Sequence, residues 1–140
     1  MIRDFNKDDL ERIMKLWLET NLQAHDFIEG EYWRGHYEMV KQMLPQANLF
    51  VWEDSRDIQG FIGLMDNYIA GIFVDAACQS RGVGKALLDY VKRSHDELSL
   101  QVYKHNVHAV EFYSREGFTV EKEQQDGDTG EAELVMGWRK

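Results

Sequence analysis

The 140-residue sequence has only one cysteine and one proline, and no apolar run approaches the ~20 residues that a membrane-spanning helix needs. A single cysteine, Cys78, excludes a disulfide within the chain, and the N-terminal residues lack the apolar run of a secretion signal. We therefore expect a soluble, cytoplasmic protein. The length and the 44% hydrophobic content suffice for one core, so we expect a single domain over residues 1–140.

Basic residues are outnumbered by acidic ones, 16 against 25, which gives a formal net charge of -9. This charge repels nucleic acid and anionic membranes, and the basic residues are scattered, so we expect neither as a partner. An acidic surface would suit a cationic amine or a basic peptide, although it is also a common means of staying soluble. The spacing of the His, Asp and Glu residues does not suit a metal ion, and we expect none.

The hydrophobic pattern predicts alternating strands and helices. Strands are expected at residues 1–5, 49–52, 60–65, 68–74, 98–103, 118–124 and 131–138. A first helix, capped by Asn6, has Leu10, Ile13, Met14 and Trp17 at helical spacing, and further helices are expected at 32–44, 86–91 and 106–115. The second helix should bury Met39, Val40 and Met43 and end at Pro45, after a loop at 21–30.

The order of these elements predicts an α/β (α+β) fold. Three consecutive strands joined by short turns favour antiparallel pairing, whereas the crossover from 68–74 through a helix to 98–103 favours parallel pairing. We expect a mixed, mostly antiparallel sheet with helices on both faces.

A glycine-containing loop separates the strand 68–74 from the helix that follows it. Gly82 and Gly84 flank one residue there, so several backbone N–H groups can converge on one anion, most simply a phosphate. The loop lacks the Gly-Lys-Ser/Thr of a Walker loop, and Leu87 stands where a dinucleotide fingerprint has its third glycine. A diphosphate site of another kind is therefore expected.

A second motif follows further along the chain. It places Asn106, Ala109 and Tyr113 on one helical face and Gly117-Phe118 after the helix. Together the two motifs and the order of elements resemble the GCN5-related N-acetyltransferase (GNAT) superfamily. The resemblance implies the GNAT-like acyl-CoA N-acyltransferase fold and acetyl-CoA (coenzyme A) as cosubstrate. The sequence departs from the family at Ala76, where a proline is frequent, and at Cys78, where an aromatic residue is frequent.

The resemblance also implies which residues bind the cofactor. The diphosphate is expected at Gln79, Ser80, Arg81, Gly82, Val83, Gly84 and Lys85. The backbone of Ile72, Phe73 and Val74 is expected to pair with the pantetheine arm, and the N–H of Val74 to polarise the thioester carbonyl. Asn106 could hold a pantetheine amide, and the small Ala109 would let the cofactor approach.

Tyr113 is the predicted general acid, because the departing CoA thiolate needs a proton that a nearby phenol can supply. The alternative is that Tyr113 is a core aromatic residue, although we expect Phe112 in the core instead. The general base stays open between His25, Asp66 and a water relayed by the backbone or Tyr68.

Several aromatic residues between the first two helices are candidates for the acceptor pocket. His25, Phe27 and Trp33, with Tyr32, could form its wall, although aromatic residues at this density also complete cores. Cys78 receives no catalytic role, because no histidine is paired with it in the pattern.

The expected function is N-acetyl transfer from acetyl-CoA to a primary amine, on a small molecule or a protein lysine, by direct attack in a ternary complex. The alternative is a non-catalytic acyl-CoA-binding or sensing module. Tyr113 favours the enzyme, because a binding module has no need of a phenol beside the sulfur. The identity of the acceptor stays open, and so does the choice between a monomer and a homodimer.

Overall fold

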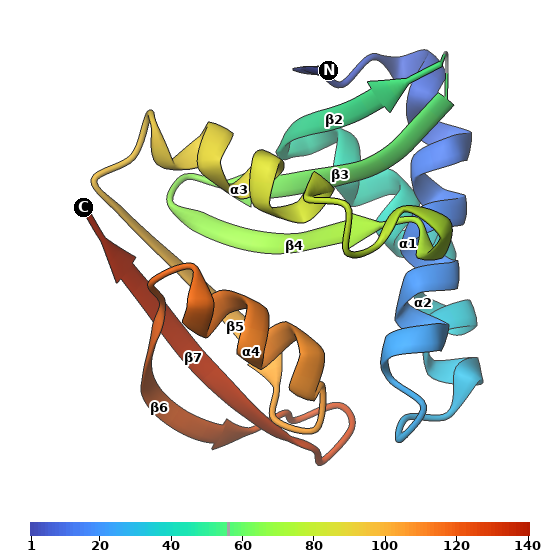
Figure 1. Ribbon diagram of the computed structural model, residues 1–140. Helices are drawn as coiled ribbons and strands as arrows, with labels where there is room; N and C mark the ends of the chain where they lie inside the picture. Colours follow the sequence, from blue (N-terminus) through green and yellow to red (C-terminus); the bar gives the residue numbers. More distant parts are fainter. Residues whose placement is uncertain (56) are drawn as a thin grey trace.

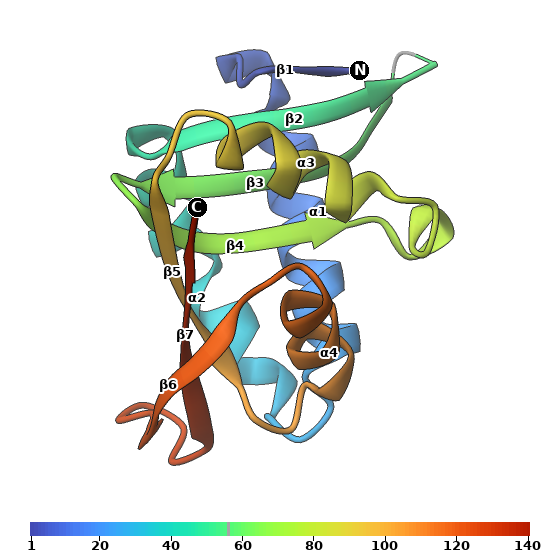
Figure 2. The same cartoon turned by 60° about the vertical axis from the view of Figure 1, so that its left-hand side comes forward.

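The computed structural model describes residues 1–55 and 57–140, which form one seven-stranded sheet in the order β1-β2-β3-β4-β5-β7-β6 (Figures 1 and 2). The strands are β1 Ile2–Asp4, β2 Asn48–Asp54, β3 Asp57–Met65, β4 Tyr68–Val74, β5 Glu97–Tyr103, β6 Thr119–Gln125 and β7 Ala132–Arg139. Among these described strands, β4 and β5 alone pair in parallel, and the other neighbours are antiparallel. The mixed, mostly antiparallel sheet is thus confirmed. Arg56, within the predicted turn between β2 and β3, lies outside the described residues.

The parallel pair is short, and this shapes the centre of the molecule. β4 and β5 are in register only at Tyr68 with Ser99 and at Ile69 with Leu100. Beyond these residues β5 stays paired with β7 while β4 stays paired with β3. The two halves of the sheet therefore diverge, as Figure 1 shows.

Helices cover both faces of the sheet, as predicted. α1 Leu10–Ala24 and α2 Gly30–Met43 contribute to one apolar core, and α3 Val83–Lys92 and α4 Val107–Arg115 contribute to a second. The described residues also form the short 3-10 helices η1 Lys7–Asp9, η2 Leu44–Gln46 and η3 Ala76–Cys78. In the described part of the chain, no helix has the length and apolarity needed to span a bilayer.

The first two helices differ from the prediction. Asn6 caps η1, which leads into α1, and α1 continues to Ala24, so the loop expected at 21–30 is shorter. The inward face of α2 was predicted wrongly, because Met39 and Met43 are 51% and 53% exposed. Trp33 is buried instead, with Tyr37 and Val40 following it at helical spacing against the same core.

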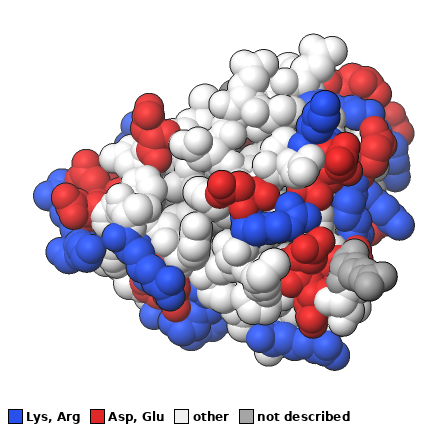
Figure 3. All heavy atoms as spheres, turned by 90° about the horizontal axis from the view of Figure 1, so that it is seen from above, with Lys and Arg blue, Asp and Glu red and all other residues white. Residues whose placement is uncertain are grey.

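Acidic and basic side chains are interspersed on the face shown in Figure 3. Two arginines of the molecule each contact two carboxylates: Arg3 contacts Asp9 and Glu53, and Arg12 contacts Asp57 and Asp75. The positive charge of both arginines is therefore balanced by neighbouring carboxylates.

Candidate functional site

A cleft of about 860 Å³ lies where β4 and β5 diverge. Its lining comes from the end of β4, the glycine-containing loop, the end of α1 and the inner face of α4. Of the predicted cofactor residues, all except Arg81 line this cleft, and Arg81 is exposed. Segments far apart in the sequence thus meet in one concave site of the size that small-molecule ligands occupy.

The glycine-containing loop presents free donors to the cleft. Among the described residues, no backbone N–H from Ser80 to Lys85 finds an acceptor in good hydrogen-bond geometry, and the first bond of α3 runs from Ala86 N–H to Gly82 O at 2.9 Å. These donors stand at a helix N-terminus, where the peptide dipoles add about half a positive charge. The loop is therefore suited to bind an anion.

The two glycines differ in what they require. Gly82 has φ +83°, the left-handed region, although a Cβ there would meet nothing within 4 Å. A Cβ on Gly84 would lie in ordinary contact, 3.6 Å from Phe112 Cζ. The loop conformation thus favours glycine at position 82, whereas position 84 has room for a methyl group.

The second half of β4 leaves an unpaired edge toward the cleft. Asp75 N–H donates to Gln59 O at 2.8 Å, so by alternation the backbone of Phe73 also faces β3. The N–H groups of Ile72 and Val74 then face the gap, and the Val74 carbonyl accepts from Gln79 Nε2 at 3.2 Å. Phe73 lies between these two residues and faces the other way: its backbone faces β3, and its ring stacks on Phe61 with a centroid distance of 4.8 Å.

Asn106 joins α4 to the far side of the cleft. Its Oδ1 accepts the Ala109 N–H at 3.4 Å and caps α4, while its Nδ2 donates to His25 Nε2 at 3.2 Å. One Nδ2 hydrogen remains for a ligand in the cleft. Ala109 is partly buried beside it and leaves the approach open.

Tyr113 is the more buried of the two adjacent aromatic residues on α4. It is 7% exposed and belongs to the core, while Phe112 is half-buried, so the expectation that Phe112 is the core member was wrong. Burial, with a smaller effect of Tyr68, raises the pKa of the Tyr113 phenol well above its usual value. At neutral pH the phenol therefore carries its proton.

The Tyr113 hydroxyl also stays accessible. Among the described residues, this hydroxyl has no hydrogen-bond partner. The described side-chain atoms that are both unpaired and fully buried are His25 Nδ1 and Trp33 Nε1, so the Tyr113 oxygen keeps some exposed surface. Tyr113 is among the residues that line the cleft.

His25 lies at the C-terminal end of α1 and lines the cleft. Its ring stacks on Trp33 at 5.1 Å, and burial lowers its pKa to about 4. Nε2 accepts the hydrogen bond from Asn106, so the proton of the neutral ring lies on Nδ1. The nitrogen that could accept a proton from a substrate is already occupied.

The other residues predicted as base or acceptor contacts are not part of the cleft lining, although Phe27 and Trp33 pack against His25. Asp66 is exposed in the β3–β4 turn, where its carbonyl meets His95 Nε2 at 3.2 Å. Trp33 is buried in the core, and the Phe27 ring packs 5.9 Å from Tyr103. Of the residues expected at the base or acceptor positions, the fold brings only His25 to the cleft.

Among the described residues, three charged lining residues were not predicted, Asp26, Arg115 and Glu116, and of these Glu116 forms an ion pair within the site. Glu116, whose side chain is 12% exposed, pairs with Lys85 at 3.0 Å and thereby holds the lysine beside the loop. Lys85 also contacts Asp89 at 3.3 Å. Because 31 residues separate Lys85 from Glu116, no local pattern could indicate this pair. Within residues 1–55 and 57–140, no group of His, Cys, Asp and Glu is arranged to hold a metal ion.

Comparison with known proteins places this geometry in context. A family model described as "Acetyltransferase (GNAT) domain" matches residues 20–130. Peptidyl-lysine N-acetyltransferase YiaC of Escherichia coli K12 is 35% identical over 140 residues, which cover 99% of this chain and 96% of YiaC. Peptidyl-lysine N-acetyltransferase YjaB of the same organism is 30% identical over 130 residues, 92% of this chain and 88% of YjaB.

Solved structures share the fold. The solution structure of apo YjaB from Escherichia coli has a TM-score of 0.88 and 27% identity, and the match covers 99% of this chain and 96% of that one. The PaiA N-acetyltransferase of Thermoplasma acidophilum, crystallised with coenzyme A, has a TM-score of 0.85 at 20% identity, over 100% and 98% of the two chains.

Proposed function

Because the chain belongs to the GCN5-related N-acetyltransferase family, as its two motifs predicted, we propose that it transfers the acetyl group of acetyl-CoA to a lysine side chain in a protein or peptide. The choice of acceptor rests on two relatives of at least 30% identity, which are both named peptidyl-lysine N-acetyltransferases. The alignments with them span most of each chain.

The observation that carries the proposal is the divergence of β4 and β5 beside a loop of free N–H donors. The donors from Ser80 to Lys85 would bind the diphosphate of acetyl-CoA, at roughly 1.5–3 kcal/mol for each charge-assisted bond. The unpaired N–H of Ile72 would pair with the pantetheine arm, and that of Val74 would face the thioester carbonyl. The second Nδ2 hydrogen of Asn106 is a further donor to that arm.

This arrangement favours direct attack on the thioester. The acceptor nitrogen forms a bond to the acetyl carbonyl carbon, and the bond from that carbon to sulfur breaks. The Val74 N–H stabilises the negative charge that develops on the carbonyl oxygen, an effect typically worth 10²–10³-fold in rate. Tyr113 gives its proton to the departing sulfur. Solvent takes up the proton that the amine loses and returns a proton to the phenolate.

Removal of the acceptor's proton is assigned to water in the cleft. Of the candidate bases, Asp66 lies outside the lining, and His25 has its accepting nitrogen engaged by Asn106. Of the two described carboxylates that line the cleft, Glu116 is paired with Lys85, whereas Asp26 is exposed just beyond the end of α1. Tyr68, whose pKa is raised by burial and by the charge of Glu133, stays protonated and can relay a proton only together with water.

The proposal is tested by incubating the purified protein with acetyl-CoA and a panel of amines. The panel contains peptides with one free lysine, the same peptides with that lysine blocked, and small amines. We expect CoA release and an acetylated lysine only where a lysine is free. Release with small amines alone would refute the peptide acceptor, and binding of acetyl-CoA without release for any amine would favour the non-catalytic binding module.

A further inference from the structure

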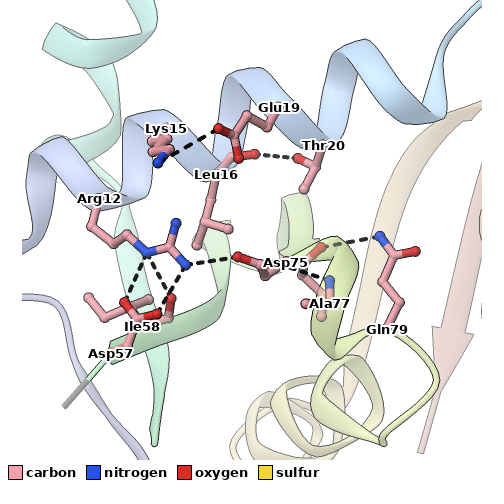
Figure 4. A network of polar contacts seen from close by, with 11 residues as sticks. Arg12, Lys15, Leu16, Glu19, Thr20, Asp57, Ile58, Asp75, Ala77 and Gln79 are labelled. Atoms are coloured by element: carbon pink, nitrogen blue, oxygen red, sulfur yellow. Dashed lines mark hydrogen bonds and ion pairs between the residues drawn. The ribbon is translucent and has the colours of Figure 1, made fainter. Parts of the chain in front are cut away.

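Arg12 of α1 reaches across to the end of β4, where the chain leaves the sheet for the glycine-containing loop (Figure 4). Its Nη2 donates to Asp75 Oδ2 at 2.9 Å, and its Nε donates to Asp57 Oδ1 at 3.1 Å and to the Ile58 carbonyl at 3.0 Å. The Arg12 and Asp75 side chains are only 24% and 27% exposed. Arg12 thus ties the end of β4 to the start of β3 and to α1.

Asp75 fixes the segment that leads into the loop through four contacts. Its N–H donates to Gln59 O and its carbonyl accepts the Cys78 N–H, both at 2.8 Å. Its Oδ1 accepts the Ala77 N–H at 2.9 Å, which leaves Oδ2 for Arg12. Because the only proline of the chain is Pro45, no proline ring restricts this segment, and these hydrogen bonds hold it.

We propose that Arg12 is a positioning residue for acetyl-CoA binding, which acts through Asp75 to hold the donors of the glycine-containing loop in their binding arrangement. The inference rests on the proposed function, because it requires that this loop binds the diphosphate. Arg12 does not line the cleft and touches no ligand itself. Each loop residue that must be ordered on binding lowers the affinity by a factor of about 5 to 30, so a loosened loop weakens binding measurably.

A matched control exists in β1, just before α1 in the chain. Arg3 also bridges two carboxylates, Asp9 at 2.9 Å and Glu53 at 3.1 Å, and is similarly exposed at 28%. It joins β1, η1 and β2, and it lies outside the cleft lining. Replacing Arg3 disturbs a comparable charge network without touching the segment from Asp75 to Cys78.

The experiment compares wild type with Arg12→Gln, Asp75→Asn and Arg3→Gln. Calorimetry gives the Kd for acetyl-CoA, and steady-state kinetics with a lysine peptide gives KM and kcat. We expect Arg12→Gln to raise both the Kd and the KM for acetyl-CoA about tenfold with little change in kcat, while Arg3→Gln leaves them near wild type. Asp75→Asn keeps an oxygen that can accept the Ala77 N–H but loses the charge facing Arg12, so it should show a smaller rise.

A second measurement does not depend on the ligand. In the free protein, amide exchange at Ala77 and Cys78 should be faster in Arg12→Gln than in Arg3→Gln. Unchanged exchange and Kd in Arg12→Gln, or an equal rise of Kd in Arg3→Gln, would overturn the inference. If Arg12→Gln does not fold, Asp75→Asn decides by the same two readouts. Failure of the wild type to bind acetyl-CoA would instead refute the proposed function.

Discussion

Lowering the pH below neutrality should destabilise the protein through His25. Burial lowers the pKa of this histidine from 6.5 to about 4 in the folded state. The unfolded chain therefore takes up the proton near pH 6.5, whereas the folded protein resists it until about pH 4. The stability contributed by the neutral ring is complete above pH 6.5 and is lost as the pH falls toward 4.

The size of the effect follows from these two pKa values. Between pH 7.5 and pH 5 the free energy of unfolding should fall by about 2 kcal/mol from this group alone. Because the ring is only partly buried, solvent screening reduces this to about 1–2 kcal/mol. Most carboxylates have not yet titrated at pH 5, so their contribution is small in this range.

The assay is urea denaturation of wild type and His25→Gln at both pH values. The variant loses the ring that stacks on Trp33, so it should be less stable at either pH, but it has no ionisable group at this position. We expect the wild type to lose about 1–2 kcal/mol more than the variant between pH 7.5 and 5. Equal losses in the two proteins would show that His25 does not titrate as its burial requires.

Substitutions in the two motifs give further predictions. Gly82→Ala, at φ +83°, should cost about 1–2 kcal/mol of stability and raise the KM for acetyl-CoA, whereas Gly84→Ala should leave the thermal midpoint near wild type because its methyl group fits beside Phe112. Asn106→Ala removes the cap of α4 and the donor to His25, and should cost about 1–3 kcal/mol. Asn106→Asp keeps the cap acceptor and should lose less; equal losses would contradict the capping role.

Local chemistry explains why much of the fold could be predicted from the sequence. β4 was predicted with its observed bounds, Tyr68–Val74, because a tight turn precedes it and a glycine-containing loop follows it. α4 was predicted at 106–115 and begins one residue later, at Val107, because the Asn106 side chain caps it. The short parallel ladder, which opens the cleft, depends on how whole strands pair. The residue pattern of a single strand therefore could not predict it.

Long-range packing accounts for the features that were missed. By their spacing, Met39 and Met43 share a face of α2 with Val40. The orientation of α2 instead places Trp33 against Trp17 of α1, and this orientation depends on the partner helix. Arg12 and Asp75 are 63 residues apart, so their contact is invisible to a motif. His25 was indicated as an acceptor or base candidate, yet the Asn106 bond that occupies its Nε2 arises only when α1 and α4 meet across the cleft.

The phenol of Tyr113 is tested most directly by Tyr113→Phe, which keeps the ring that packs on Phe118 and removes only the hydroxyl. Calorimetry with acetyl-CoA and kinetics with a lysine peptide should be measured on the same preparation. We predict a kcat about 10²–10⁴-fold below wild type with a nearly unchanged Kd for acetyl-CoA. A kcat equal to that of the wild type would contradict proton donation by Tyr113.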